Sequence, residues 1–385
     1  MDRRTFERVL IKVSAKRRAA HGALLLGAVA LLSLGPSAFA QGDRKGGADE
    51  ETGAVFALTN SPAGNAVVVF HRAEDGSLTP AGSYPTGGVG TGAGLGSQDA
   101  VIVSDDRRWL IAVNAGSNSI SSFRIHDTGL TLIDTKPSGG ILPISVTLRG
   151  GLLYVLNAGV PNNVTGFRIT SQGRLNALEG STRPLSGAST NPAQVGFSDH
   201  GDTLIVTEKD TNIIDTYAID DDGRADGPYI NVSAGPTPFG FAVGHQNTLL
   251  VSEAGAGGGA STYRIGDDRL DVVSGMIVTG QRAACWAILT PNGRFGYVTN
   301  AGTGNISGVA VARDGSASLL DADGVTAVTG GNPTDLAMSG NGRYLYARVG
   351  ALNAIAIFRI QSNGSLSARP ALTGTPAGLA GLAGF

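Results

Sequence analysis

The sequence predicts an all-β protein, a seven-bladed β-propeller that its own C-terminal strand closes. The first observation is a repeated motif, a tight turn, a short β run and a second turn, whose clearest copy is Thr290–Asn305. One position of this motif, the Asn column, recurs at intervals from 43 residues (114 to 157) to 54 residues (60 to 114). The column is occupied by Asn60, Asn114, Asn157, Glu208, Glu253, Asn300 and Val349. Each copy has room for four short strands, which is typical of a propeller blade.

Two further observations favour this fold class. A bulky apolar residue follows nine or ten positions after each member of the Asn column, at Phe70, Phe123, Phe167, Tyr217, Tyr263, Val309 and Phe358. The composition, with 58 glycines and only 16% charged residues, suits a β protein with many turns. No long amphipathic helical pattern occurs in the sequence.

Residues 1–40 have the features of a secretory signal peptide. A basic stretch precedes the apolar run Gly22–Leu34, and Ala38-Phe39-Ala40 fits a small-x-small cleavage site before Gln41. The apolar run of 13 residues is short for a membrane span, and an uncleaved anchor is the alternative. Arg3-Arg4 faintly resembles a twin-arginine signal, so Sec and twin-arginine export both stay open. We expect a periplasmic or secreted protein with no membrane span after cleavage.

Charge and thiol content restrict the partners of the mature chain. Cleavage removes seven basic and two acidic residues from totals of 29 and 31, which leaves 22 basic and 29 acidic residues, a net charge of −7. An acidic chain without a basic stripe argues against a nucleic-acid partner. Cys285 is the one cysteine, so an exported chain of this size must depend on its core instead of on disulfides. We expect a monomer.

The domain organisation follows from where the repeats begin and end. We expect residues 41–53 to be a disordered leader and residues 54–385 to form a single propeller domain. Blade 1 begins with its second strand, and the missing first strand is expected at the C-terminus, because Gly374–Ala380 resembles Gly331–Ala337 at the start of blade 7. A ring closed in this way has no unpaired edges between its first and last blades. A frayed tail is the alternative.

Tyr84–Ser97 is the longest glycine-rich stretch, and it joins blade 1 to blade 2. It lacks the GxGxxG pattern and the strand-to-helix context of a dinucleotide-binding loop. Such a loop could cover the mouth of an axial channel, but a flexible linker is the favoured interpretation. The acidic turns Asp220–Gly223 and Asp321–Gly324 lack EF-hand spacing and are interpreted as solvated hairpin turns.

Positions where the repeat departs from its own pattern are candidates for function, because the fold does not require the departure. Glu208, which Lys209 follows directly, and Glu253 replace the amide of the Asn column. An Asn there is expected to tie its own turn through hydrogen bonds from side chain to backbone, which Glu does poorly. A second column, at the start of each first strand, reads Gly378, Ala100, Ser145, Gln194, Gly240, Trp286 and Asp335 for blades 1 to 7.

Both columns belong to one face of a propeller, because the start of the first strand and the end of the second strand share that face. The sequence therefore predicts a polar pocket there, lined by Gln194, Glu208, Lys209, Glu253, Trp286 and Asp335. Two nearby carboxyl groups raise the pKa of one of them and permit general acid–base chemistry. The alternative is that both glutamates are solvated rim residues and that Trp286 belongs to the core. The histidines lack metal-ligand spacing, so neither a metal nor another cofactor is expected.

Tyr297-Val298-Thr299-Asn300 is a literal YVTN motif. Together with the seven repeats it resembles the YVTN-repeat and lactonase-type seven-bladed propellers, the group that includes bacterial 6-phosphogluconolactonase and fungal carboxymuconate-lactonising enzyme. The resemblance covers the whole mature chain. It implies the propeller fold and an activity on lactones.

The resemblance also points to one blade. Catalytic members show a G-P-R-H-x-x-F strand followed by an N-E-L turn, and the matching residues are Asn191–Phe197 and Thr207–Lys209. The Pro, the Phe and the Glu of that pattern are present, and Glu208 is the catalytic residue that the resemblance implies. Ala193 and Gln194 stand where the pattern has Arg and His.

Two functions follow from this reasoning. The first is an exported lactone hydrolase or lactonising enzyme for a small sugar or aromatic lactone, in which Glu208 moves a proton and Lys209 or Gln194 stabilises the oxyanion. The second is a non-catalytic propeller of the cell envelope that binds a ligand or a protein partner, which the missing Arg and His favour. A redox quinoprotein is a third candidate, for which the chain lacks additional Trp or Cys residues.

Overall fold

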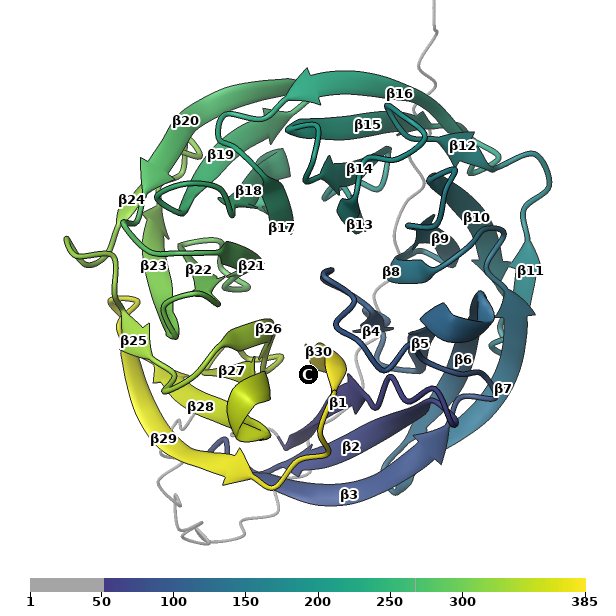
Figure 1. Cartoon of the computed structure of the whole chain (residues 1–385), viewed down its shortest axis with the longest axis horizontal. Helices are drawn as coiled ribbons and strands as arrows, with labels where there is room; N and C mark the ends of the chain where they lie inside the picture. The colour runs from purple at the N-terminus through teal and green to yellow at the C-terminus, as the bar shows by residue number, and fades with distance from the viewer. Residues whose placement is uncertain (1–51, 267) are drawn as a thin grey trace, which may run out of the picture. The chain divides into compact units, whose positions relative to one another are not determined.

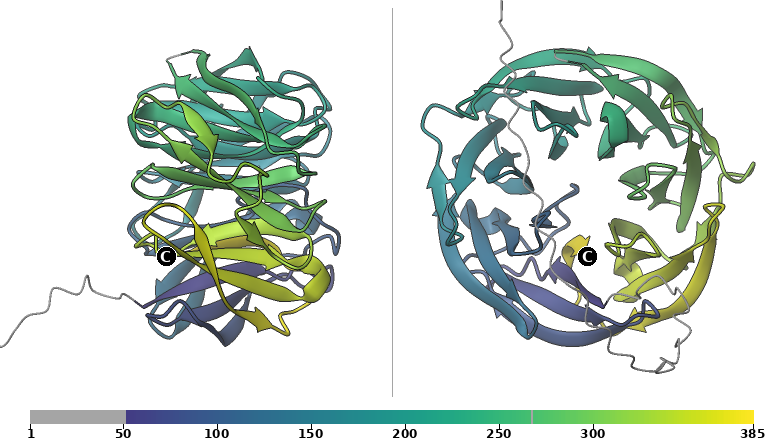
Figure 2. Two further views of the ribbon diagram at one scale, coloured as in Figure 1. Left: turned by 90° about the vertical axis from the view of Figure 1, so that its left-hand side faces the viewer. Right: turned by 180° about the vertical axis from the view of Figure 1, so that it is seen from behind.

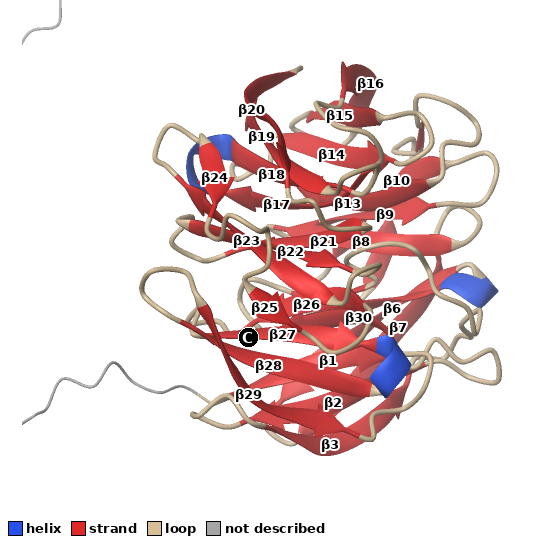
Figure 3. Ribbon diagram, turned by 60° about the vertical axis from the view of Figure 1, so that its left-hand side comes forward, coloured by secondary structure: helices blue, strands red, loops and turns tan. Residues whose placement is uncertain are grey.

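The computed structural model describes residues 52–385 apart from residue 267, and these residues form seven small antiparallel sheets around one axis (Figure 1). The predicted all-β, seven-bladed propeller is confirmed. Helical structure in the described part is limited to three short 3₁₀ turns, η1 (Ala115–Ser117), η2 (His245–Asn247) and η3 (Gly350–Leu352), drawn in blue in Figure 3. The expected signal peptide and leader lie outside the described residues except for Thr52 and Gly53, and β1 already begins at Gly53.

The strands of each blade follow one another from the axis outward. Blade 1 contains β30 (Ala380–Gly384), β1 (Gly53–Leu58), β2 (Ala66–Arg72) and β3 (Leu78–Pro85). Blade 2 contains β4 (Val101–Val103), β5 (Trp109–Asn114), β6 (Ser119–His126) and β7 (Gly129–Pro137). Blade 3 contains β8 (Pro143–Arg149), β9 (Leu152–Asn157), β10 (Asn163–Ile169), β11 (Leu175–Ala177) and β12 (Arg183–Pro184). Blade 4 contains β13 (Pro192–Phe197), β14 (Thr203–Glu208), β15 (Ile213–Ile219) and β16 (Ala225–Val232).

The remaining three blades complete the ring. Blade 5 contains β17 (Pro238–Gly244), β18 (Thr248–Glu253), β19 (Gly259–Ile265) and β20 (Leu270–Val278). Blade 6 contains β21 (Ala284–Leu289), β22 (Phe295–Asn300), β23 (Asn305–Val311), β24 (Ala317–Leu319) and β25 (Ala327–Val328). Blade 7 contains β26 (Pro333–Met338), β27 (Tyr344–Val349), β28 (Ala354–Ile360) and β29 (Leu366–Thr373).

The core lies between the blades. All six residues of β5, β14, β18 and β22 are buried, because each of these second strands is covered on both faces by neighbouring sheets. The outermost strands, such as β16 and β29, are largely exposed. Burial on both faces explains why the sequences of these second strands are nearly continuous apolar runs, without an alternation of apolar and polar residues.

A tyrosine in the second strand links several blades to the next one. Tyr154, Tyr297 and Tyr346 donate their hydroxyl hydrogens to the carbonyl oxygens of Gly223, Gly364 and Gly76, at 2.9, 2.8 and 3.0 Å. Each acceptor glycine belongs to the hairpin turn between the third and fourth strands of the following blade. The stretch 220–223 is therefore a hairpin turn, as its sequence predicts.

The C-terminal strand closes the ring, as predicted. β30 pairs antiparallel with β1, with Ala380 opposite Leu58. Figure 2 shows this part of the chain completing the sheet whose other strands come from the start of the propeller. The predicted first-strand column is wrong by one residue in this blade. In blade 7, Leu336 follows the column residue Asp335 and pairs with Ala347, two residues before Val349 of the Asn column. In blade 1, Ala380 pairs with Leu58, which is likewise two residues before Asn60 of the Asn column. Leu379 and not Gly378 thus occupies the first-strand column of blade 1, and a β-bulge accommodates the difference.

Candidate functional site

Glu208 lies inside blade 4 and is 0% exposed. The backbone N–H of Ser186 donates to Glu208 Oε1 at 3.0 Å, and the hydroxyls of Ser186 and Thr211 donate to Oε2 at 2.5 and 2.6 Å. Asp215 lies beside it and accepts from the same Ser186 N–H at 3.0 Å. Burial, and next the neighbouring Glu208, raises the pKa of the Asp215 carboxyl group to about 8. Glu208 is therefore enclosed by its surroundings in blade 4.

Glu253 has the corresponding place in blade 5 and is also 0% exposed. The hydroxyls of Ser233 and Ser261 donate to Glu253 Oε1 at 2.8 and 2.5 Å. Burial raises the pKa of the Glu253 carboxyl group to about 7. Neither glutamate is a solvated rim residue, and the two carboxyl groups accept hydrogen bonds from different partners.

In blades 5 and 6 the residue of the Asn column has the same architectural role, which Glu253 and Asn300 both fulfil. Asn300 donates from Nδ2 to Asn305 Oδ1 and Ser307 Oγ at 2.7 and 2.8 Å, so it ties the second strand to side chains of the third strand. Glu253 ties the same strands as an acceptor, because a hydroxyl donor stands on its third strand. The sequence predicted hydrogen bonds from this side chain to the backbone of its own turn, whereas Asn300 and Glu253 bond side chains of the third strand.

The glycine-rich stretch is fixed over the axis and is not a free linker. Lys209 Nζ donates to the carbonyl oxygen of Gly96 at 2.6 Å and lies 5.0 Å from the centre of the Phe239 ring. Trp286 Nε1 donates to the carbonyl oxygen of Ser97 at 2.8 Å. Burial lowers the pKa of Lys209 to about 8. Two predicted pocket residues thus hold a loop that covers the face of the Asn column.

The residues after this loop close the axis from within. Gln98 Nε2 donates to the carbonyl oxygen of Ala287 at 2.8 Å, and the backbone N–H of Ala287 donates to Gln98 Oε1 at 3.0 Å. Gln194 donates from Nε2 to Asp99 Oδ2 at 2.7 Å and accepts from the backbone N–H of Phe241 at 2.6 Å. Gln194 therefore lies at the axis, as its column predicted, and it connects blade 4 to blade 5 and to the loop.

Beneath this closure the axis contains a cavity of about 370 Å³. Gln98, Asp99 and Gln194 form its closed end, and the first strands of all seven blades form its walls. Those strands run away from the Asn-column face, so the cavity opens on the opposite face. Of the described residues that line it, Asp99 alone is charged, and most of the others are aliphatic or aromatic. Of the residues of the predicted pocket, Gln194 lines this cavity, and Glu208, Lys209, Glu253, Trp286 and Asp335 do not.

Two carboxyl groups lie near the closed end. Burial raises the pKa of Asp99 to about 7, against the opposing effect of the hydrogen bond from Gln194. Asp335 is 1% exposed and is not among the residues lining the cavity. Burial holds the pKa of Asp335 well above its usual value, and the charge of Asp99 adds to this. In the described part of the chain, Asp335 Oδ2 has no hydrogen-bond partner.

The sequence reasoning missed Gln98 and Asp99. A signal was present, because the position before the first-strand column is occupied by Asp99 in blade 2 and by Ile144, Ala193, Phe239 and Cys285 in blades 3 to 6. A carboxylate at a position that is otherwise mainly apolar is a departure from the repeat. The first-strand column, which contains Gln194, lies one residue further along the chain and does not include Asp99.

Comparison with known proteins agrees with this architecture. Residues 56–186 match the family model described as Lactonase, 7-bladed beta-propeller. No curated protein sequence matches the chain.

Solved structures match along the propeller. A protein from Bacteroides uniformis described as "a putative 6-phosphogluconolactonase" is 18% identical, with a TM-score of 0.71 over 85% of this chain and 98% of that one. The periplasmic gluconolactonase of Pseudomonas aeruginosa is 17% identical, with a TM-score of 0.68 over 86% of this chain and 98% of that one. At these identities the likeness to the solved structures establishes the fold.

Proposed function

We propose that this lactonase-like propeller opens or closes the ring of a small uncharged lactone in its axial cavity, with Asp99 as the acid–base residue. The observation that carries the proposal is a single carboxyl group at the closed end of an otherwise uncharged cavity. Gln194 Nε2 donates a hydrogen bond to one oxygen of that group, Asp99 Oδ2, at 2.7 Å. No described residue forms a hydrogen bond with the other carboxyl oxygen. An acid–base residue needs this combination of a fixed orientation and one accessible oxygen.

In this reaction Asp99 first accepts a proton and then donates it. In hydrolysis the Asp99 carboxylate takes a proton from a water molecule while the water oxygen adds to the lactone carbonyl carbon. The ring C–O bond then breaks, the proton passes to the leaving ring oxygen, and a hydroxy acid results. Lactonisation is the reverse reaction. The pKa of about 7 suits both directions, because near neutral pH Asp99 exists in both protonation states.

The charge of the cavity indicates the class of lactone. A phosphate or carboxylate group on the substrate would meet Asp99 with no Lys, Arg or His among the described lining residues. An unpaired anion in such an environment is strongly disfavoured. The substrate class is therefore an uncharged lactone, such as the gluconolactone for which the Pseudomonas neighbour is named.

Glu208 is the competing assignment, because the family resemblance implies it. We expect Asp99→Asn to lower kcat/KM for glucono-1,5-lactone by at least about 100-fold, measured by pH-stat titration with correction for spontaneous opening. Glu208→Gln is expected to stay within about threefold of the native enzyme, since Glu208 does not reach the cavity. Asp271→Asn, at an exposed site, is the control. Full activity in Asp99→Asn together with loss in Glu208→Gln would move the site to blade 4.

A ligand-binding propeller without catalysis is the second candidate. Ala193 and Gln194 in place of the Arg and His of catalytic relatives favour it. In that case the purified protein opens no lactone, yet both Asp99→Asn and the native protein bind one. The pH-stat assay separates the two functions, and calorimetry with a stable lactam analogue shows that a protein without turnover still binds.

We further propose that the mature chain begins at Gln41 and works outside the cytoplasm as a monomer without a cofactor. No helix in residues 52–385, residue 267 excepted, is long and apolar enough to cross a bilayer. Intact-mass measurement of the protein from the periplasmic fraction tests the cleavage site, and light scattering tests the oligomeric state. A mass that includes residues 1–40 contradicts cleavage.

A further inference from the structure

Two glutamine side chains at the closed end of the axial cavity bond the surrounding strands as a neighbouring strand would. Gln194 Oε1 accepts from the backbone N–H of Phe241 at 2.6 Å, and Gln194 Nε2 donates to the carbonyl oxygen of Phe241 at 3.1 Å. Gln98 bonds the N–H and the carbonyl oxygen of Ala287 in the same way, at 3.0 and 2.8 Å. A group that exchanges both bonds with one strand residue reproduces the hydrogen-bonded pair of an antiparallel sheet.

The innermost strand of a blade has one edge without a partner strand, and β17 shows where this edge continues. β17 pairs with β18 alone, and the N–H and carbonyl oxygen of Phe241 point to the other side, where Gln194 bonds them. Residues of an antiparallel strand direct these groups to alternate edges. The pairing is regular from Phe241 to Gly244, so Val243 also directs its N–H and carbonyl oxygen to the axis.

The lining of the axial cavity confirms that strand edges border it. Runs of three consecutive residues line it from four innermost strands, at Val101–Val103, Phe241–Val243, Leu336–Met338 and Leu382–Gly384. A strand that turns one face to a cavity lines it with alternate residues, because successive side chains point to opposite faces. Consecutive lining residues therefore indicate that these strands present their edges, and with them their peptide groups.

Val243 is the first residue of the β17 edge that the glutamines leave open. No described residue outside β18 bonds its N–H or its carbonyl oxygen, and the residue is half-buried. A ligand that displaces water from these groups must replace the hydrogen bonds, so it must offer one acceptor and one donor.

The open edge lies close to the proposed acid–base residue. Gln194 Nε2 bonds both Asp99 Oδ2 and the carbonyl oxygen of Phe241, at 2.7 and 3.1 Å. Val243 follows Phe241 by two residues, or about 7 Å along the strand. This span leaves room for the one water molecule that hydrolysis needs between Asp99 and a carbonyl group bound at Val243.

We infer that the axial cavity takes a lactone with an acylated amino group on the carbon next to its ring carbonyl. The amide N–H and the ring carbonyl oxygen of such a molecule flank one carbon atom, as the N–H and carbonyl oxygen of an amino-acid residue do. They therefore pair with both groups of Val243, and the N–H of Val243 bonds the oxygen on which negative charge develops. The inference rests on the proposed lactone chemistry and names the substrate class within it.

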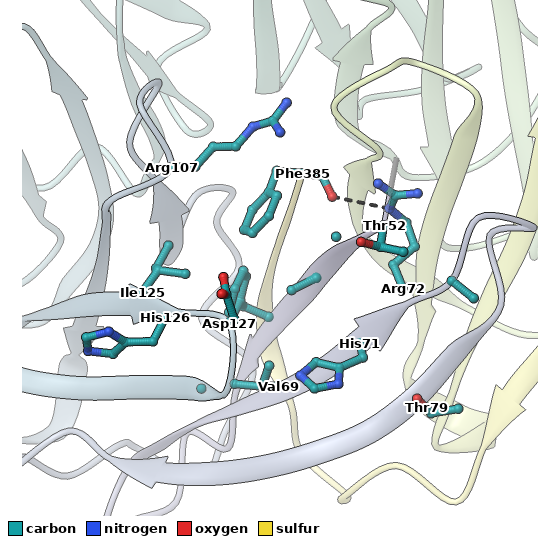
Figure 4. Close-up of a pocket in the computed structure, with 15 residues that line it drawn as sticks. Thr52, Val69, His71, Arg72, Thr79, Arg107, Ile125, His126, Asp127 and Phe385 are labelled. Atoms are coloured by element: carbon teal, nitrogen blue, oxygen red, sulfur yellow. Dashed lines mark hydrogen bonds between the residues drawn. The ribbon is translucent and has the colours of Figure 1, made fainter. Parts of the chain in front are cut away.

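The walls of the axial cavity suit the acyl chain. Most of the lining side chains are apolar, among them Val101, Val103, Phe197, Met338 and Leu382. The volume of about 370 Å³ lies within the roughly 300–1,000 Å³ typical of ligand pockets. The cavity between blades 1 and 2 is larger, at about 610 Å³, but Figure 4 shows the titratable side chains of His71, His126 and Asp127 beside it. An uncharged acyl chain is therefore expected in the axial cavity.

Isothermal titration of the purified protein with a ligand that cannot be opened tests the inference. The probe is 2-(hexanoylamino)cyclopentanone, whose ring has no N–H of its own, and the control is 2-(hexanoyloxy)cyclopentanone, an ester without the amide N–H. We expect the amide to bind, and the ester to bind at least about fivefold more weakly, because the carbonyl oxygen of Val243 loses its donor. Equal affinities, or no binding of either compound, overturn the inference.

This titration and the pH-stat assay fail separately. Binding of the amide without opening of any lactone contradicts the proposed catalysis and supports recognition by Val243. Lactone opening with equal affinity for the amide and the ester supports the catalysis and contradicts the recognition.

Val243→Pro tests the strand edge itself. Proline removes an N–H that makes no bond to β18, so the affinity for the amide is expected to fall about tenfold. Leu289→Pro is the matched control, with an expected change within about twofold. Leu289 follows Ala287 on β21 as Val243 follows Phe241 on β17, and it is not among the described lining residues.

Circular dichroism must first show the native β signal in both variants. Unchanged affinity in a folded Val243→Pro, or an equal loss in Leu289→Pro, contradicts binding at this edge. If Val243→Pro does not fold, the comparison of the amide with the ester decides alone.

Discussion

Carboxyl groups buried inside blades 4 and 5 make the stability of the protein depend on pH. Asp215 and Glu253 have pKa values raised to about 8 and about 7, in both cases mainly by burial. The folded state thus prefers their protonated form, while the unfolded chain releases the proton near pH 4. Their stabilising contribution is complete below about pH 4 and is lost as the pH rises toward 7 or 8.

We therefore expect the free energy of unfolding to fall between pH 5 and pH 8. The slope is about 1.4 kcal/mol per pH unit for each such group within its own window. Urea denaturation at several pH values measures it. Higher stability at pH 8 than at pH 5 would contradict the burial of these groups.

Glu253→Gln tests the origin of this slope. The amide keeps an oxygen for Ser233 and Ser261 and cannot ionise, so the variant is expected to show a shallower decline and to gain stability relative to the native protein as the pH rises. Asp271→Asn, on the exposed part of β20, should leave the slope unchanged. An unaltered slope in Glu253→Gln assigns the pH dependence to other groups.

Single residues were predictable where a repeat column defines their position. Gln194 was expected at the axis and lies there, because the column counts positions along equivalent strands. The partners of Lys209 and Trp286 were not predictable, since Gly96 and Ser97 precede them by 113 and 189 residues. Sequence spacing carries no information about contacts of this range.

The hairpin turn between third and fourth strands is the element that joins one blade to the next. Gly364 has a φ of +87°, and a Cβ there would lie 2.5 Å from the Phe295 ring of blade 6. Its carbonyl oxygen accepts the Tyr297 hydroxyl at 2.8 Å. The turn therefore needs glycine for two reasons, its backbone conformation and the closeness of the neighbouring blade.

Gly364→Ala is expected to lower the free energy of unfolding by about 3 kcal/mol, the sum of left-handed strain and steric overlap. Gly180→Ala is a matched control, because Gly180 has a φ of +70° and open space around its Cβ position. Gly180→Ala should lower the free energy of unfolding by only about 1 kcal/mol. Chemical denaturation of both variants measures the difference, and equal losses would contradict the packing of the turn against blade 6.

The glycine-rich loop shows how composition can mislead at the scale of an element. Its glycines predict flexibility, but Lys209, Trp286 and Asn60 bind its backbone, and Asn60 Nδ2 donates to the carbonyl oxygen of Ala93 at 2.6 Å. A glycine-rich stretch with few apolar side chains can still be fixed when distant polar groups satisfy its carbonyl oxygens.

Removing one of these contacts should loosen the loop alone. Trp286→Phe deletes the N–H group that bonds Ser97, a loss of about 1 kcal/mol, so amide exchange in residues 91–97 should become roughly fivefold faster. Hydrogen exchange followed by mass spectrometry measures this. Trp109→Phe, in β5, should leave exchange in the loop unchanged. Native exchange rates in Trp286→Phe would show that this contact does not hold the loop.

At the scale of the whole molecule, the order of the blades and the closing strand followed from the sequence. Repeats at regular intervals determine the number of sheets, and a leftover strand motif at the C-terminus has one unpaired partner in blade 1. The face on which the axial cavity opens did not follow. It depends on the plug formed by Gln98, Asp99 and Gln194, which joins segments from different blades.

A crystal structure of the protein with a stable lactam analogue of gluconolactone tests whether the axial cavity is the site of lactone chemistry. We expect the lactam in the axial cavity, with a polar atom within hydrogen-bond distance of Asp99 and no anion beside it. A lactam bound instead near Glu208, beneath the glycine-rich loop, would contradict the assignment of the axial cavity as the site of lactone chemistry.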